Sequence, residues 1–356
     1  MAFRAARTLV FTNDGADLIG FNYLQKTTFS CAPHLIDVLS RLSEWADAEA
    51  VKSAIDDDDA SDALVEQLVA CGVLLRQGSP EEARETAYVR DWEWALPAAL
   101  LHFSVQDNPP VSVAELERLQ VEKARTVPQP ELVRRHEGRD DAIAFAPQSE
   151  ESELFALMAR RRTHREVTTA PIAAGAVADC LYAGLGVVGH TRNEAGVLPL
   201  TMTPSGGARN PYEAYVLARR VEGLAPGLYH YSAADRSLLP LSSGAGVRPS
   251  ALVGDQPWMD DMACLIFLCA SFGRTMWKYS DPNAYRVVLI EAGHIGQNIM
   301  LAATHHGLTA CPTAALAHRA IAELCQLDDP VLDAPVYVLG LGVPAPDATS
   351  TGFERI

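Results

Sequence analysis

Positive charge is scarce in this 356-residue chain, which has 29 Lys and Arg residues against 45 Asp and Glu residues and a formal net charge of −16. Proteins that bind nucleic acid without sequence preference place cations against its phosphates. The charge balance therefore argues against nucleic acid as a partner. Any phosphate-bearing ligand must instead be held by a local group of basic residues.

The sequence also shows no pattern for disulfides, for a metal site or for a membrane segment. The seven cysteines form no CxxC pair and no disulfide framework, so buried free thiols are favoured over a redox or metal role. Adjacent His305 and His306 point to different sides of a helix, so we expect no metal site there. The N-terminal residues lack the apolar core of a signal peptide, and no run of about 20 apolar residues occurs. We therefore expect a cytoplasmic protein without a membrane segment.

The first 105 residues predict a small module. Turn formers Asn13-Asp14-Gly15 between alternating apolar and polar residues indicate a β-hairpin over residues 7–25. Apolar spacing then predicts helices near 35–42 and 64–71 and a short strand at 73–75. This order resembles a winged-helix-like domain. Because the module is acidic, a peptide laid along a strand edge or helix groove is a better expected partner than DNA.

Residues 84–150 form two segments of different composition. Aromatic-rich residues 84–105 predict one packed helix, and the polar, Pro-containing residues 106–150 predict a linker. Residues 151–356 then mix helices with non-consecutive strands, which is typical of an α+β domain. The predicted helices cover 151–163, 173–187 and 285–307, and the predicted strands lie near 213–221, 263–271 and 335–342.

Two motifs of this domain suit a phosphate-bearing, flat ligand. Residues 160–165, RRRTHR, are the only dense basic cluster of the domain, and guanidinium groups with a hydroxyl match phosphate oxygens. The alternative is a helix C-terminus whose cations complement the dipole. In the second motif, PSGGAR at 204–209, two glycines permit close backbone approach, and a hydroxyl and a guanidinium can donate to a ring. By itself such a loop can also be a simple turn.

A third motif could move protons. Lys278 and Tyr279 are adjacent groups whose protonation burial can tune, which suits proton removal from carbon. The alternative is a surface charge beside the edge of a core. His294, Gln297 and Asn298 share a helix face, where polar packing at a subunit interface is as good an explanation as chemistry.

Taken in order, these motifs resemble the flavin-dependent nitroreductase superfamily, and specifically its SagB-type (McbC-like) branch of azoline dehydrogenases. Four stretches carry the resemblance: ARRRTHRE at 159–166, PSGGARNPYEAYVLARRVEGLAPGLYHY at 204–231, KYSDPNAYRVVLIEAGHIGQNIMLAATHHGL at 278–308, and PVYVLGLGVP at 335–344. The resemblance implies a nitroreductase-like fold that binds FMN at a homodimer interface, preceded by the winged-helix-like domain.

The same resemblance implies roles for individual residues. The phosphate would be held by Arg161, Arg162, Thr163 and Arg165, the isoalloxazine would lie against Pro204, Ser205, Gly207 and Arg209, and Lys278 and Tyr279 would be catalytic. Two places depart from the pattern. Asn210 stands where related sequences often have His, and Cys311-Pro312-Thr313-Ala314 replaces a glycine-containing loop beside the flavin.

The implied reaction oxidises thiazolines or oxazolines of a peptide to azoles by proton removal and hydride transfer to flavin N5. Residues 1–105 would hold the precursor peptide or a partner cyclase. Two alternatives remain open at this point, namely an NAD(P)H-dependent nitroreductase or flavin reductase, and a non-catalytic scaffold of a peptide-modifying complex.

Overall fold

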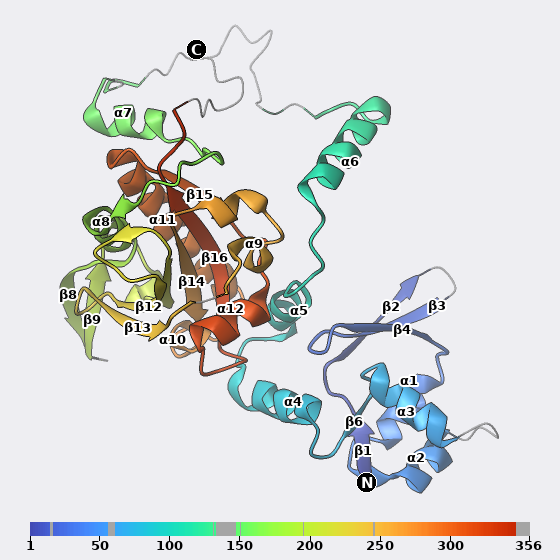
Figure 1. Ribbon diagram of the computed structural model, residues 1–356. Helices are drawn as coiled ribbons and strands as arrows, with labels where there is room; N and C mark the ends of the chain where they lie inside the picture. The colour runs from blue at the N-terminus through green and yellow to red at the C-terminus, as the bar shows by residue number, and fades with distance from the viewer. Residues whose placement is uncertain are drawn as a thin grey trace, which may run out of the picture. The chain divides into compact units, whose positions relative to one another are not determined.

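A computed structural model describes residues 1–14, 17–55, 61–130, 132, 147–149, 151–194, 196–244 and 246–346 (Figure 1). The chain divides into two compact units, and neither unit is one continuous stretch. The first unit contains Met1–Gln106, Phe272–Arg286 and Leu327–Ala334, and the second contains the segments Asp107–Ser271, Val287–Gln326 and Pro335–Ile356. Two short segments from the C-terminal half therefore pack with the N-terminal residues.

The N-terminal residues of the first unit form two small antiparallel sheets and three helices. One sheet has the order β2-β3-β4 and the other β5-β1-β6. The strands are β1 (Ala2–Ala5), β2 (Leu9–Asp14), β3 (Asp17–Asn22), β4 (Thr27–Cys31), β5 (Ala46–Asp47) and β6 (Leu74–Arg76), and the helices are α1 (Leu35–Arg41), α2 (Ala48–Ile55) and α3 (Asp62–Ala70). The expected hairpin is confirmed by the pairing of β2 with β3, although Gly15 lies outside the described residues, as does the acidic run 56–59.

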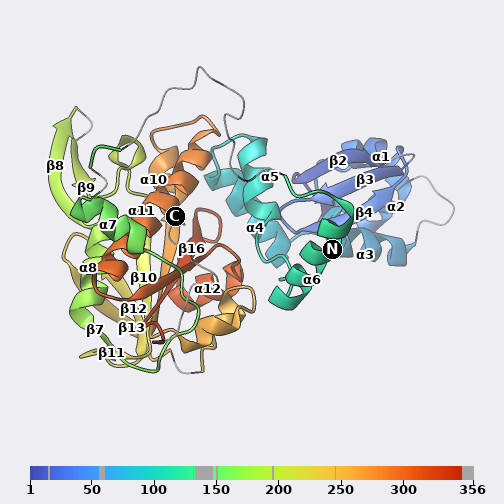
Figure 2. The same cartoon turned by 90° about the horizontal axis from the view of Figure 1, so that it is seen from above.

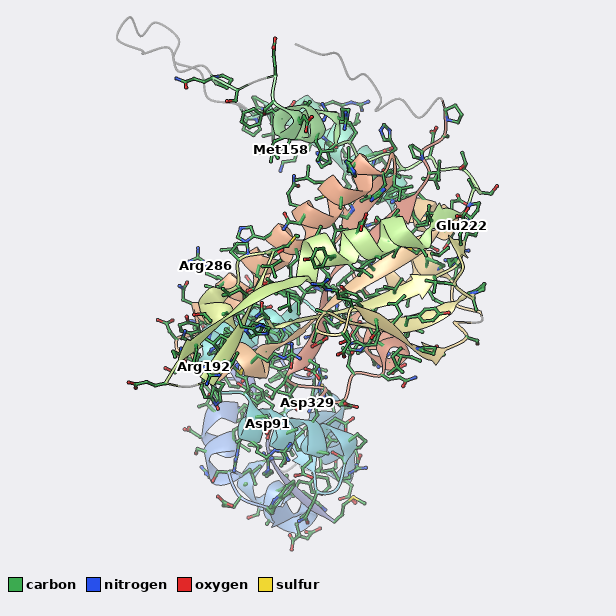
Figure 3. All side chains as sticks on the ribbon, turned by 90° about the vertical axis from the view of Figure 1, so that its left-hand side faces the viewer. Asp91, Met158, Arg192, Glu222, Arg286 and Asp329 are labelled. Atoms are coloured by element: carbon green, nitrogen blue, oxygen red, sulfur yellow. The ribbon has the colours of Figure 1, made fainter. Side chains whose placement is uncertain are left out.

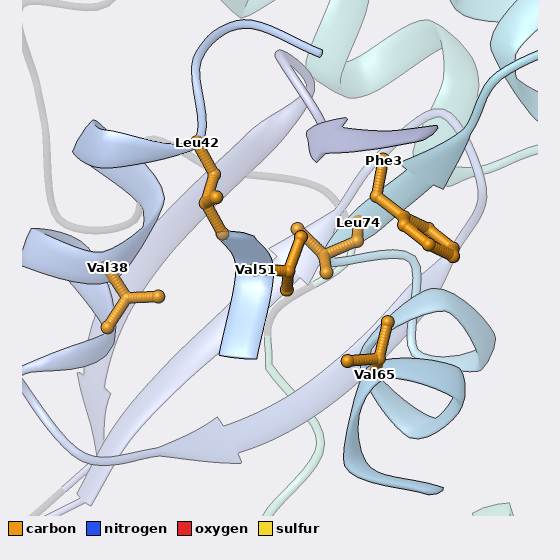
Figure 4. Packing of buried hydrophobic residues seen from close by; sticks show 6 residues of the cluster. All are labelled: Phe3, Val38, Leu42, Val51, Val65 and Leu74. Atoms are coloured by element: carbon orange, nitrogen blue, oxygen red, sulfur yellow. The ribbon is translucent and has the colours of Figure 1, made fainter. Parts of the chain in front are cut away.

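A small apolar core joins these helices to the second sheet. Its fully buried side chains come from β1, β6 and all three helices (Figure 4), and they are Phe3, Val38, Leu42, Val51, Val65 and Leu74. The apolar spacing that predicted the helices near 35–42 and 64–71 therefore marks residues that face one core.

Residues 84–105 were expected to form one helix, and this expectation is wrong. The structure has α4 (Pro80–Asp91) and α5 (Leu96–Ser104), separated by residues 92–95. Pro97 provides the reason: it has no N–H to donate to the carbonyl of residue 93, and its ring would clash with that carbonyl. At the start of α5 a proline is tolerated, so a new helix begins there.

The second unit is built on a six-stranded sheet with the order β13-β12-β10-β14-β16-β15. Its strands are β10 (Tyr212–Ala218), β12 (Gly227–Ser232), β13 (Ser237–Ser242), β14 (Cys264–Ser271), β15 (Thr309–Thr313) and β16 (Asp333–Gly342). Strand β14 is buried from Cys264 to Ala270, as its uninterrupted apolar sequence requires of a central strand. The strands predicted near 213–221, 263–271 and 335–342 are confirmed.

Helices and two strand pairs complete this unit. The pairs are β7 (Ile172–Ala173) with β11 (Val221–Glu222), and β8 (Val187–Asn193) with β9 (Gly196–Thr201). The helices are α6 (Val113–Thr126), α7 (Glu153–Arg160), α8 (Ala174–Leu185), α9 (Pro249–Leu252), α11 (Ala284–His305) and α12 (His318–Cys325), and α10 (Phe272–Met276) belongs to the first unit. Helix α6 lies in the stretch that was predicted as a linker. Helix α11 begins in the first unit and enters the second at Val287.

Helix α11 is the central helix of the second unit, and α8 packs against it (Figure 2). A Cβ atom at Gly184 of α8 would lie 2.9 Å from Cγ1 of Ile299 and 3.1 Å from Cγ2 of Ile295. Among the described helices α11 alone is long and apolar enough to cross a membrane, and 44% of its most apolar window is buried inside the protein. Its buried stripe of Val288, Ala292, Ile295 and Ile299 is that of a core helix.

The close approach of α8 to α11 can be tested with two glycines of the same helix. Gly184→Ala should lower the free energy of unfolding by about 1–3 kcal/mol, because its methyl group overpacks the contact with Ile299. Gly175→Ala is the matched control. An exposed Cβ there meets nothing within 4 Å, so better helix propensity should stabilise the protein by up to about 1 kcal/mol. Urea unfolding measures both, and equal effects would contradict the contact.

Candidate functional site

The glycine-rich loop at 204–210 has a backbone that few sequences could adopt. It contains a short 3-10 helix, Gly206–Ala208, in which Gly207 has φ 63° and ψ 23°. Ala208 and Asn210 are also left-handed, with φ 55° and 45°. A Cβ atom at Gly206 would lie 2.8 Å from Cγ1 of Val287 on α11. One glycine is therefore needed for its backbone conformation and the other for close approach to the helix.

Asn210 holds this loop in shape. Its backbone N–H donates to Oγ of Ser205 at 2.8 Å, and its side-chain amide donates to the carbonyls of Pro199 (3.1 Å) and Ala208 (3.3 Å). The hydroxyl of Thr201 donates to its Oδ1 at 3.0 Å. Asparagine also tolerates the left-handed conformation better than most residues. Asn210, which departs from the family pattern, thus supplies an amide whose hydrogen bonds fix both the loop and the end of β9.

Glu291 is a site residue that the sequence reasoning missed. Its side chain projects from α11 to the loop, where it accepts hydrogen bonds from the backbone N–H of Gly206 at 3.3 Å and from the hydroxyl of Ser205. It is 5% exposed. Burial raises its pKa to about 7, and the two hydrogen bonds oppose that shift. A signal was present in the sequence, since Glu291 interrupts the apolar stripe formed by Val288, Ala292 and Ile295.

The basic segment after α7 runs beside the edge strand β15. The backbone N–H of His164 donates to Oγ1 of Thr309 at 2.9 Å, and its carbonyl accepts from that hydroxyl at 3.1 Å. Sγ of Cys311 donates to the same carbonyl at 3.1 Å. Burial raises the pKa of this thiol to about 11, so it stays protonated. Cys311, Pro312 and Thr313 thus belong to β15 rather than to a loop, and proline is compatible with an edge strand.

The predicted phosphate-binding side chains differ in exposure. Thr163 and Arg165 are exposed, whereas Arg161 and Arg162 are half-buried. The guanidinium carbon of Arg165 lies 4.6 Å from the centre of the Trp258 ring, a cation–π contact. Nη1 of Arg162 donates to the carbonyl of Arg161 at 2.6 Å. Side chains of this segment therefore have fixed neighbours within the second unit.

Helix α11 contacts the loop 204–210 and also Tyr337, a neighbour of the basic segment 160–165. Val287 and Glu291 meet the loop at Gly206, and one to two turns further on Gly296 lies under the ring of Tyr337, where a Cβ would come within 2.5 Å of Cε1. Burial raises the pKa of Tyr337, and the positive charge of Arg161 opposes that shift. The structure thus places the loop 204–210 and the basic segment in the same unit along one helix.

The predicted catalytic pair lies in the first unit. Lys278 is exposed, Tyr279 is half-buried, and Nζ of Lys278 lies 5.2 Å from the centre of the Tyr279 ring. The backbone N–H groups of both residues donate to the carbonyl of Thr275, at 3.1 and 3.0 Å. The pair therefore sits on a tight turn that follows α10.

The polar face of α11 is partly internal. Nδ2 of Asn298 donates to Oγ1 of Thr203 at 3.0 Å, and Thr203 donates to the carbonyl of Gly184 at 2.6 Å. His294 and Gln297 are exposed. Near the end of the helix His306 contacts Asp179, with 2.8 Å between Nε2 and Oδ2. No group of three potential metal ligands occurs among the described residues.

Glu291 should make stability depend on pH. Its folded-state pKa of about 7 exceeds the ordinary value of 4.5, so its contribution to stability is full below about pH 4.5 and is lost as pH rises through about 7. Glu291→Gln cannot ionise and keeps an acceptor for Gly206. Thermal unfolding should therefore show the variant to be more stable than the parent at pH 8 and no more stable near pH 4.5.

Glu222→Gln is the control for this experiment, because Glu222 is exposed at the surface of the second unit (Figure 3). Its melting temperature should follow that of the parent at every pH. Parallel curves for Glu291→Gln and the parent would contradict the burial and ionisation described for Glu291.

Comparison with known proteins places this geometry in a family. The protein MJ1384 of Methanocaldococcus jannaschii, named provisionally as a nitroreductase, is 30% identical over 192 residues, or 53% of this chain and 93% of that one. The trifolitoxin-processing protein TfxB of Rhizobium leguminosarum bv. trifolii is 32% identical over 136 residues, 35% of each chain. Among solved structures, the E. coli microcin synthetase McbBCD complex with truncated pro-MccB17 bound contains a chain with TM-score 0.52 and 20% identity, covering 72% of this chain and 97% of its own.

The nitroreductase family model matches residues 158–343, more than half of the chain, and this span contains the basic segment, the glycine loop and α11. The chain belongs to the nitroreductase family.

Proposed function

We propose that this oxidoreductase is an FMN-dependent azoline dehydrogenase, which converts thiazolines or oxazolines of a peptide into thiazoles or oxazoles. The observation that carries the proposal is the loop 204–210. Its left-handed backbone and its bonds to Glu291 and Asn210 leave a preformed surface of backbone and short side chains for a flat ring. The similarity to TfxB, a toxin-processing protein, and to a chain of the microcin synthetase favours a peptide over a free small molecule as the substrate.

The residues of the second unit fit FMN by their chemistry. The segment 160–165 supplies four guanidinium groups and a hydroxyl in a chain that is otherwise strongly acidic, and such donors match a phosphate monoester. We assign Arg161, Arg162, Thr163 and Arg165 to the phosphate. We assign Pro204, Ser205, Gly207 and Arg209 to the isoalloxazine, since a larger residue at Gly206 would push this loop away from α11.

A homodimer is part of the proposal, since exposed apolar side chains of the second unit need a partner. They come from α7, from α11, from the β8–β9 hairpin and from the residue that follows β9, and they are Leu154, Phe155, Met158, Val188, Val197, Leu200, Met202, Leu289 and Ile290. Large exposed apolar residues are typical of a protein interface. We place this dimer in the cytoplasm.

In the proposed reaction the azoline ring loses a proton from a ring carbon and a hydride, two hydrogen atoms in all, and becomes aromatic. Bound FMN would supply the hydride acceptor, and dioxygen would serve as its oxidant. Lys278 and Tyr279 are the proposed catalytic residues. Lys278 is exposed on the turn and Tyr279 is half-buried beside it, and an amine or a phenolate can accept a proton from carbon.

The first unit offers a place for the peptide. A cavity of about 310 Å³ lies between β4, α1 and α3, and its walls include Phe29, Cys31, His34, Leu35, Gln67 and Leu68. Among the described residues no strand pairs with the outer edge of β4, so an extended peptide can add to it. Residues 1–106 carry 17 acidic and eight basic side chains, which favours a cationic stretch of a precursor peptide. A cyclase that makes the azoline could share this surface.

The strongest competing function is an NAD(P)H-dependent nitroreductase or flavin reductase, which the similarity to MJ1384 favours. The two functions differ in the source of the hydride. An azoline dehydrogenase takes it from the peptide ring, whereas a reductase takes it from a nicotinamide. A non-catalytic scaffold would bind no flavin at all.

Lys278→Ala tests the proposed chemistry. The variant should retain FMN and its fold, because Lys278 is exposed, and azole formation should slow by at least about 100-fold through loss of the proton acceptor. Mass spectrometry of an azoline peptide in a single turnover measures the product. Lys123→Ala, at an exposed site on α6, is the control and should keep the parental rate. An unimpaired Lys278→Ala enzyme would remove this residue from the mechanism.

Gln67→Arg tests the peptide surface. The arginine side chain should fill the cavity beside β4 and raise the Kd of the precursor peptide at least about tenfold, a cost of about 1.4 kcal/mol. Oxidation of a short azoline that does not reach the first unit should be unchanged, as should FMN content. Thr86→Arg adds the same side chain at an exposed position of α4 and should bind like the parent. Equal peptide affinity in both variants would place recognition elsewhere.

A further inference from the structure

An aromatic cluster in the first unit joins the N-terminal residues to the turn that carries Lys278 and Tyr279. Two of its rings come from residues 92–95 between α4 and α5, two come from α5, and two come from the returning segment 272–286. They are Trp92, Trp94, His102, Phe103, Phe272 and Tyr285, all at most 8% exposed. Phe272 begins α10 and Tyr285 is the second residue of α11, so the cluster holds both ends of the turn between these helices.

The rings meet at short distances. Trp92 stacks on His102 with 5.1 Å between ring centres, and Phe272 stacks on Tyr285 at 5.5 Å. The ring of Trp94 stands edge-to-face against Phe272 and Tyr285, at 6.0 Å from each. Each such contact adds to the apolar area that the rings bury. The two segments therefore form one rigid support.

One hydrogen bond connects this support to the proposed catalytic pair. Nε1 of Trp94 donates to the backbone carbonyl of Tyr279 at 2.8 Å, and Trp94 is 2% exposed. A hydrogen bond that is partly shielded from water is stronger than the same bond at the surface, and its loss removes this partner of the Tyr279 carbonyl. The backbone of Tyr279 is thus fixed from both sides, by this bond and by its own N–H to Thr275.

The neighbouring tryptophan makes no such bond. Nε1 of Trp92 is buried and has no hydrogen-bond partner in the part of the chain that the structure describes. Its contribution is packing alone, against His102 and Phe103. Trp92 and Trp94 therefore belong to the same cluster, but only the N–H of Trp94 donates to the turn.

We propose that Trp94 is a positioning residue, which holds the Lys278–Tyr279 turn in the geometry that azoline oxidation requires. This inference rests on the proposed function. It gives residues 92–103 a second role beside peptide recognition: they support the reaction. A truncation of residues 1–105 would remove both roles at once and uncover Phe272 and Tyr285, so point variants of the full-length holoenzyme are needed to separate them.

Trp94→Phe removes the N–H and keeps an aromatic ring, and Trp92→Phe is the matched control. Amide hydrogen exchange of residues 277–281 should become about tenfold faster in Trp94→Phe and should stay within about twofold of the parent in Trp92→Phe. With an azoline peptide, kcat of Trp94→Phe should fall about tenfold while KM changes by less than about twofold. FMN content should be the same in all three proteins.

A double variant separates positioning from general destabilisation. If Trp94 acts through the turn, Trp94→Phe should lower the residual rate of Lys278→Ala no further, whereas independent effects would multiply. Equal exchange rates in the two tryptophan variants would overturn the inference, as would an unchanged kcat in Trp94→Phe despite faster exchange. Full activity of Lys278→Ala would be a failure of the proposed function instead, and hydrogen exchange would still decide whether Trp94 holds the turn.

Discussion

The approach of the Gly206 backbone to helix α11 is the constraint on which the rest of the site depends. There is no room for a side chain between this loop and Val287, so the loop can only stay close if position 206 is glycine. The left-handed residues that follow then direct the chain into β10, the strand that pairs with the buried β14. The loop is thereby joined to the centre of the sheet on one side and to the central helix on the other.

The burial of Glu291 beside this loop affects the stability of the folded protein. A buried carboxyl group destabilises the folded protein when it is ionised, and its raised pKa is the measure of that penalty. Its hydrogen bonds with Gly206 and Ser205 offset part of this penalty, and they also fix the loop. A loop that is already fixed in shape is an advantage where a ligand must be held in a defined geometry.

The sequence predicted the main elements because their patterns are strong. The apolar run of β14, the helical stripe of α11 and the hairpin residues around Asn13 and Asp14 each indicate one structure. It did not predict the β8–β9 hairpin, whose apolar and polar residues do not alternate regularly, nor the break between α4 and α5 that Pro97 explains. The candidate motifs stand out in the sequence, but the residues that hold them in place do not. Glu291 and Trp94 act through contacts with residues 85 and 185 positions away in the chain, and a local pattern does not say which residues such side chains will meet.

In the proposed reaction a peptide ring reduces a bound flavin. The most direct measurement is the visible spectrum of the purified protein under anaerobic conditions, before and after addition of an azoline-containing peptide and without any nicotinamide. We expect the flavin bands to bleach and the peptide to become lighter by two hydrogen atoms. A yellow protein whose bands bleach only on addition of NADH or NADPH would contradict the account and identify a reductase.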